Sequence, residues 1–228
     1  MKNKSSNLRA LFAVSLAIGL FFVLNIANNT ISPVHADELD NILLEQPKPL
    51  PEFELIDHFL KPFNRDQLLG KWTFVFFGYT NCPDVCPVTL MEMDKLIDVL
   101  KPNPPHIDQF QYIFVSVDPD RDTPQHLAEY VKYFNASILG VTGSINELST
   151  LAKSVKIKFS KAEGTKDEYG VNHSSALLLI DPGARYFARF RAPHDVDKIY
   201  RQFRQLAQRV NSDIKKTDTK TQESNPNP

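Results

Sequence analysis

The chain has 228 residues, and its 26 lysines and arginines nearly balance its 27 aspartates and glutamates, for a formal net charge of -1. A nucleic-acid-binding domain usually shows a clustered basic excess, so this balance argues against nucleic acid as the main partner. Two cysteines are too few for a disulfide scaffold, whereas a hydrophobic content of 42% suffices for one buried core.

A long apolar run follows a short basic flank at the N-terminus. Residues 1–9 carry three basic side chains, and residues 10–27, ALFAVSLAIGLFFVLNIA, are uncharged. At about 1.5 Å per residue this run approaches the ~30 Å hydrocarbon core of a bilayer. It predicts one transmembrane helix acting as a signal anchor, with the basic flank in the cytoplasm and the rest of the chain outside it. The alternative is a cleaved signal peptide that ends near Ala36.

Two further segments flank the predicted folded domain, which spans residues 49–211. Residues 28–48 are predicted to form a tether, and the prolines near its end favour an extended chain. Residues 212–228 hold one isoleucine in seventeen residues, a composition typical of disorder. The sequence therefore predicts one folded domain between a tether and a disordered tail.

Within the domain, strand-like runs of apolar residues alternate with segments whose apolar residues recur at helical spacing. In chain order the predicted elements are a strand at 72–79, a helix at 87–100, a strand at 112–118, a helix at 122–134, a short strand or loop at 138–143, a helix at 144–155, a hairpin with strands at 175–181 and 185–192, and a helix at 195–210. This order predicts an α/β sandwich with a central β-sheet flanked by helices. Because the cysteines fall between the first core strand and its helix, the thioredoxin-like fold is the candidate.

Cys82 and Cys86 are four residues apart, in the stretch FFGYTNCPDVCP. On a helix this spacing places two side chains on one face, where they could close a disulfide or present two thiolates to one metal ion. A helix N-terminus lowers thiol pKa values, so we expect thiolate near neutral pH. A structural disulfide or two buried free thiols are the alternatives. Two thiolates are incomplete for structural zinc, but with one imidazole they suit copper.

His173 is the histidine best placed to supply that imidazole, because it directly precedes a strongly apolar strand. Thioredoxin-like folds bring a loop at this position against the cysteine motif, although the pattern alone also allows a structural role. Asp118 ends the second core strand and could orient a ligand or carry a proton, or serve the turn that follows. Asp122 or Thr123 is predicted to cap the next helix.

Three stretches in this order, FFGYTNCPDVCP, VSVDPDRDTP and YGVNHSSALLLIDP, resemble the Sco/SenC family of copper proteins, and the resemblance covers about residues 49–208. It implies a thioredoxin-like fold with an N-terminal hairpin extension. It also implies one copper ion per chain, Cu(I) or Cu(II), with Cys82, Cys86 and His173 as ligands and Asp118 nearby. Family members often have Asp where this chain has Asn172, so we expect the site to persist with an altered copper affinity.

The resemblance also implies a function. Family members are membrane-tethered and help to assemble the dinuclear copper site of cytochrome c oxidase subunit II, by delivering copper, by reducing its cysteines, or both. For this chain it implies an inner-membrane protein whose folded domain lies in the periplasm. Its partners would be subunit II and another periplasmic copper chaperone or thiol reductant.

The function implied is that of a metallochaperone rather than an enzyme. The alternative is a membrane-tethered thiol-disulfide reductase, in which Cys82 and Cys86 form a redox-active pair without copper delivery. His173 distinguishes the two candidate functions, because exchange between dithiols requires no imidazole.

Overall fold

A computed structural model describes residues 39, 41–101, 110–165 and 168–223. The predicted basic flank and transmembrane helix, residues 1–27, lie outside this part of the chain. None of the helices in the described part is both long enough and apolar enough to cross a membrane.

The described part is built around an eight-stranded sheet in the order β1-β10-β9-β4-β5-β6-β2-β3, with β7 and β8 as a separate pair. The strands are β1 (Leu43–Pro49), β2 (Glu54–Asp57), β3 (Pro62–Asn64), β4 (Trp72–Gly78), β5 (Phe110–Ser116), β6 (Ile138–Thr142), β7 (Phe159–Lys161), β8 (Val171–His173), β9 (Leu177–Ile180) and β10 (Arg185–Phe190). Strand β4 pairs in parallel with β5 and antiparallel with β9. All residues of β4 are buried, as the sequence predicts for a strand covered on both faces.

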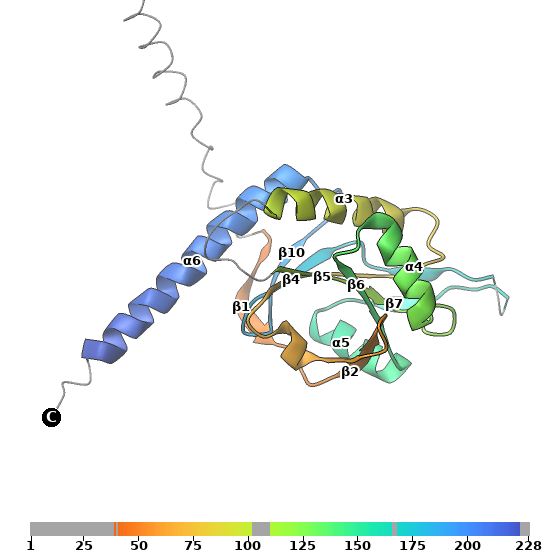
Figure 1. The fold of residues 1–228 in the computed structure, drawn as a ribbon, viewed down its shortest axis with the longest axis horizontal. Coiled ribbons are helices and arrows are strands. Elements are labelled where there is room, and N and C mark those ends of the chain that lie inside the picture. The colour runs from red at the N-terminus through yellow and green to blue at the C-terminus, as the bar shows by residue number, and fades with distance from the viewer. Residues whose placement is uncertain (1–38, 40, 102–109, 166–167, 224–228) are drawn as a thin grey trace, which may run out of the picture. The chain divides into compact units, whose positions relative to one another are not determined.

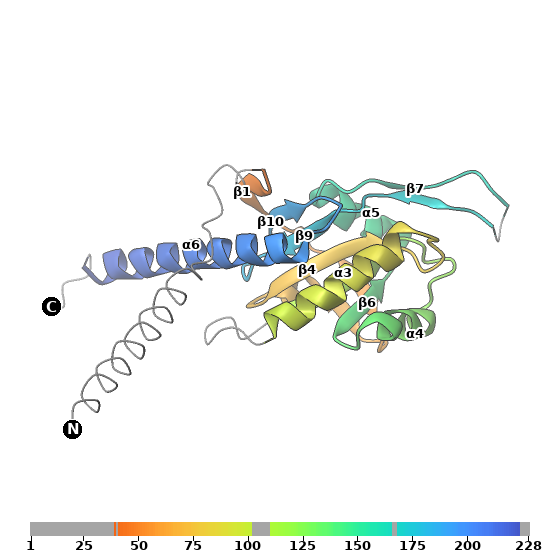
Figure 2. The same ribbon diagram turned by 90° about the horizontal axis from the view of Figure 1, so that it is seen from above.

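Helices cover both faces of this sheet. They are α3 (Val85–Leu100), α4 (Pro124–Phe134), α5 (Ile145–Ser154) and α6 (Val196–Glu223), with a 3-10 helix, η1 (Arg65–Leu68), after β3. Figure 1 shows α3 and α6 on one face of the sheet and α5 on the other, and Figure 2 shows the β7–β8 ribbon projecting beyond the sheet. The α/β sandwich predicted from the sequence is therefore confirmed.

Aromatic side chains join α6 to the sheet. The ring of Phe203 on α6 lies 5.4 Å from Trp72, 5.7 Å from Phe74 and 5.3 Å from Phe110, measured between ring centroids. Aromatic pairs at these separations add to the stabilisation from burial. These contacts anchor the N-terminal half of α6 against β4 and β5, the strands that lead to the site described below.

Two predicted boundaries differ from the structure. Strand β1 falls largely within the predicted tether 28–48 but pairs antiparallel with β10, in the register Lys48↔Tyr186. Helix α6 continues to Glu223, past Ser212, where the sequence predicts a disordered tail. No Gly or Pro interrupts 212–223, and extending a helix already nucleated by packing costs little.

His58, which follows β2, is half-buried, and its Nδ1 accepts a hydrogen bond of 2.9 Å from the Gly140 backbone N–H. Burial lowers its pKa, although the neighbouring Asp57 partly opposes the shift. The unfolded chain then takes up the proton at a higher pH than the folded chain, so the free energy of unfolding falls as the pH drops below about 6.5.

We therefore expect His58→Asn to lose less stability than the wild type between about pH 7 and about pH 5, measured by urea unfolding. The exposed Gln125, which does not titrate, offers a control, and Gln125→Asn should leave the pH slope of the wild type unchanged. An unchanged slope in the His58 variant would contradict this explanation.

Candidate metal centre

The two cysteines lie where the central strand gives way to a helix. Strand β4 ends at Gly78 and α3 begins at Val85. Between them, the Cys82 backbone N–H donates a hydrogen bond of 3.3 Å to the Tyr79 carbonyl. Cys86 lies in the first turn of α3 and is fully buried, whereas Cys82 retains 9% exposure. Both thiols thus sit at the carboxyl end of a parallel strand, where α/β folds place their functional sites.

Strand β8 brings His173 to the cysteines from 87 positions further along the chain. The His173 Nε2 lies 3.3 Å from Cys86 Sγ, and the ligand atoms of Cys82, Cys86 and His173 all lie within 4.8 Å of one another. The imidazole meets the rings of Phe76 and Tyr79 edge-on, at centroid distances of 6.0 and 5.6 Å. The structure therefore brings together the three side chains that the sequence singles out.

The His173 ring is oriented by the backbone. Its Nδ1 lies 3.1 Å from the Ser174 carbonyl oxygen, which can only accept a hydrogen bond, so Nδ1 carries the hydrogen. The lone pair of Nε2 then faces the cysteine sulfurs. Burial lowers the pKa of His173, which favours the neutral imidazole that metal ions require.

The pKa of the Cys86 thiol shifts in the opposite direction to the one expected from the sequence. Burial raises the pKa of its thiol, and the nearby Cys82 and Asp122 raise it further, while a hydrogen bond to the Tyr79 backbone opposes the shift. The predicted lowering by the helix N-terminus is therefore wrong for Cys86, because removal of this fully buried sulfur from water outweighs it. A bound cation favours the thiolate form, so Cys86 would lose its proton on metal binding.

Asp122 is a site residue that the sequence does not reveal. Its carboxylate is fully buried and accepts hydrogen bonds from the Thr80 backbone N–H (2.9 Å), the Thr80 hydroxyl (2.6 Å) and the Ser116 hydroxyl (2.5 Å). It thereby ties the cysteine loop to the end of β5. Thr123 caps α4 by accepting from the His126 N–H, so the cap predicted at Asp122 or Thr123 is Thr123.

Asp118 fixes the segment that precedes β8. Its carboxylate accepts hydrogen bonds of 2.6 Å from the Tyr169 hydroxyl and from Arg121 Nε. The Arg121 guanidinium also lies 3.6 Å from the Tyr169 ring centroid. Asp118 is therefore placed to act on His173 through the β8 backbone. Asn172 is exposed on β8, paired in register with Ser160, and its effect on copper affinity stays a prediction.

Gly78 leaves room for Cys86. A Cβ at this position would meet Cys86 Sγ at 2.7 Å and Phe114 Cε2 at 2.8 Å, well inside van der Waals contact. We expect Gly78→Ala to displace the Cys86 sulfur and to lower the free energy of unfolding by about 1–3 kcal/mol, the usual cost of overpacking. Urea unfolding measures the loss.

Gly70→Ala is the matched control for Gly78→Ala. No atom lies within 4 Å of a Cβ at Gly70, although its φ of 74° adds backbone strain. It should therefore cost stability without changing the reactivity of the Cys86 thiol toward a small alkylating reagent. An unchanged Cys86 reactivity in Gly78→Ala would contradict the proposed displacement.

The types of ligand in this group restrict which metal ion the site can bind. Within the described residues, these three side chains are the one group of three or more His, Cys, Asp or Glu residues whose ligand atoms could share an ion. Structural zinc takes four protein ligands, whereas two thiolates with one imidazole suit copper. The group therefore fits one copper ion.

A thioredoxin-like fold with two cysteines and a histidine converging beside its central strand defines a class of thiol-based metal-binding or redox proteins. Residues 44–208 match the family model described as SCO1/SenC. The chain therefore belongs to the SCO1/SenC family, and the resemblance seen in the sequence is confirmed.

Individual relatives agree. The chain is 33% identical over 195 residues to the SCO2-like protein of Rickettsia felis, covering 83% of this chain and 92% of the relative. The structure of Arabidopsis thaliana ScoI with copper bound is 36% identical, with a TM-score of 0.62 over 68% of this chain and 98% of that one. BsSco, described as a member of the Sco family of cytochrome c oxidase assembly proteins, is 22% identical, with a TM-score of 0.56 over 69% and 93%. This last likeness shows the fold alone.

Proposed function

We propose that the chain binds one copper ion through Cys82, Cys86 and His173 and acts as an assembly factor for cytochrome c oxidase. The observation that carries this proposal is the convergence of two sulfurs and one imidazole nitrogen within 4.8 Å, in a chain of the SCO1/SenC family. The copper-bound structure of the Arabidopsis relative supports the choice of metal.

The proposed mechanism is ligand exchange with the dinuclear copper site of cytochrome c oxidase subunit II. Three protein ligands leave copper room for an incoming thiolate. Cys86 is fully buried, whereas Cys82 and His173 reach the surface in part. Partner thiolates therefore approach from the Cys82 and His173 side, and Cys86 holds the cargo until the last exchange. Asp122 and Ser174 keep the cysteine loop and the imidazole in place during this sequence.

The proposed location follows from the N-terminal sequence. Residues 10–27 are apolar and follow a basic flank, which supports an anchor in the inner membrane with the folded residues in the periplasm. There the chain could meet subunit II and a copper chaperone or thiol reductant that reloads it.

An anaerobic copper titration of the reduced full chain against a competing Cu(I) chelator tests the proposal. We expect one tightly held ion per chain in the wild type and loss of that ion in Cys82→Ser/Cys86→Ser, because serine hydroxyls are poor ligands for Cu(I). Ser149→Ala/Ser154→Ala, a double change on α5, serves as the control. Copper binding that survives removal of both sulfurs would refute the proposed site.

Thiol-disulfide exchange is the second candidate function, favoured by the two free cysteines, whose sulfurs lie within 4.8 Å of one another. The Cys82 thiolate would attack an oxidised partner and form a mixed disulfide. Cys86 would then resolve it, so that two electrons pass to the partner and this chain's disulfide closes. Reduction of an oxidised subunit II domain at the same rate with and without copper, and unaffected by His173→Ala, would favour this function.

A further inference from the structure

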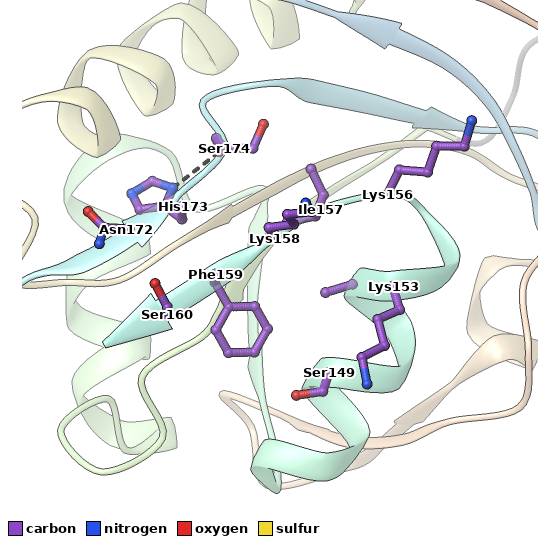
Figure 3. A pocket seen from close by; sticks show the side chains of 11 residues that line it. Ser149, Lys153, Lys156, Ile157, Lys158, Phe159, Ser160, Asn172, His173 and Ser174 are labelled. Carbon is purple, nitrogen blue, oxygen red and sulfur yellow. Dashed lines mark hydrogen bonds between the residues drawn. The ribbon is translucent and has the colours of Figure 1, made fainter. Parts of the chain in front are cut away.

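A groove of about 690 Å³ opens beside the metal centre and takes His173 into its wall. It runs from the C-terminal half of α5, through the turn that follows it, to the β7–β8 ribbon (Figure 3). Its volume falls in the range of sites that hold ligands. Nothing in the proposed copper chemistry requires a depression of this size.

The chemistry of the groove is basic. Lys153, Lys156 and Lys158 line it and are exposed, and no Asp or Glu is among the residues that line it. The chain as a whole carries a net charge of -1, so this local excess of positive charge is a property of the groove. The hydroxyls of Ser149 and Ser160 add hydrogen-bonding groups beside the lysines.

Strand β7 is an edge strand that contributes residues to the groove. In the described part of the chain β7 pairs with β8 alone, in a two-stranded sheet, and its residues Phe159 and Ser160 line the groove. An extended segment can add its own hydrogen bonds to such an edge. The partly buried Phe159 and the buried Ile157 provide an apolar floor for alternate side chains.

We propose that this groove docks an extended acidic segment of the protein that receives or supplies the copper. Carboxylates of that segment pair with Lys153, Lys156 and Lys158, and the docked partner places its own ligand atoms beside His173. The inference rests on the proposed function, because it assigns the groove to the partner of the same site. Electrostatic complementarity of this kind mainly speeds encounter and sets the register of a complex.

A protein segment fits the groove better than a membrane surface or a nucleic acid. A flat bilayer would meet exposed lysines but would not enter a groove whose wall contains His173. Nucleic acid binding usually relies on a broad basic excess, whereas this chain is nearly neutral. The mixture of three cations, hydroxyls, an apolar floor and a strand edge matches a polypeptide.

Binding of a labelled acidic peptide to the full chain tests the proposal. The probe is an acetylated peptide of about ten residues in which glutamate alternates with serine, compared with the same peptide carrying glutamine. We expect the glutamate peptide to bind the wild type more tightly, with an affinity that falls as salt rises. Lys153→Glu/Lys156→Glu/Lys158→Glu should bind it about ten-fold more weakly or worse, and the corresponding triple Gln variant should lie between.

The matched control reverses three exposed lysines on other elements, in Lys48→Glu/Lys61→Glu/Lys132→Glu. It applies the same change of net charge away from the groove and should alter the affinity by less than about two-fold. Equal losses in the two triple variants, or no loss in the groove variant, would overturn the proposal. Preference of the wild type for phosphatidylglycerol vesicles over the glutamate peptide, through the same lysines, would overturn it in favour of a membrane.

Chelator titration of the same variants separates this inference from the proposed function. Both triple variants should bind copper as tightly as the wild type, because neither changes a residue of the metal centre. If the chain held no copper but still distinguished the glutamate peptide through its groove lysines, the proposed function and the identity of the docked partner would fail, while binding of an acidic segment in the groove would stand. If copper bound normally and the peptide were ignored, the groove alone would fail.

Discussion

His173→Ala is expected to weaken copper binding more than about a hundred-fold, because loss of an outer partner of a metal ligand alone typically costs 10–100-fold. His173 supplies the only nitrogen within the three-residue group, and its Nε2 already faces Cys86 Sγ at 3.3 Å. The effect should be larger for Cu(II) than for Cu(I), since Cu(I) tolerates two thiolates alone. Chelator competition in each oxidation state measures both losses.

His126→Ala is the matched control for this experiment, because His126 is exposed in the first turn of α4 and should leave both affinities unchanged. The absorption bands of the Cu(II) form give a second readout, which should shift only when the imidazole is lost. Copper affinities indifferent to His173 would rule out the three-ligand site and leave thiol-disulfide exchange as the better account.

Asp122→Ala is expected to lower the free energy of unfolding by on the order of 4 kcal/mol, because it removes the fully buried acceptor of three hydrogen bonds, one buried and two partly buried. The donors left behind are the Thr80 N–H, the Thr80 hydroxyl and the Ser116 hydroxyl. Since Thr80 lies in the loop that carries Cys82, copper affinity should fall about ten-fold or more in those chains that remain folded. Urea unfolding and chelator competition give the two values.

Asp122→Asn is a smaller chemical change at the same residue. One amide oxygen can still accept from Thr80, so we expect about half of the loss seen with alanine. Asp120→Ala, at an exposed position, should change stability by less than about 0.5 kcal/mol. If Asp122→Ala were as stable as Asp120→Ala, the loop would have to be held by something other than the Asp122 carboxylate.

Much of the fold could be predicted because its signals are local. The uninterrupted apolar run that becomes β4 indicates a strand buried on both faces, and the apolar spacing after Pro87 indicates α3. Ser144 at the start of α5 accepts from the Glu147 N–H, which is the bond that a serine three residues before a glutamate favours at a helix start. The four-residue step from Cys82 to Cys86 predicts that the two thiols lie close together, and they do, although Cys82 lies in the loop before α3 and only Cys86 is on the helix.

Boundaries and the state of Cys86 were less predictable, because they depend on partners distant in the sequence. The sequence of β1 predicts a proline-containing tether, but in the structure β1 forms a strand because it pairs with β10. The position of Cys86 at a helix N-terminus predicts a lowered thiol pKa, but the fold buries the thiol completely and raises its pKa instead. In both cases a tertiary contact outweighs a local tendency.

The sequence by itself determined the alternation of strands and helices, the cysteine pair and the family to which the chain belongs, since all three are carried by residue type and spacing. The tertiary structure alone decided that Asp122 holds the cysteine loop rather than capping α4, and that three lysines form a groove beside His173. The physical reason is that a periodic pattern reports which face of an element is buried. The pattern does not report which distant side chains meet. Thr80 and Asp122 are 42 positions apart and Cys86 and His173 are 87 positions apart, and these pairs form only when the sheet assembles.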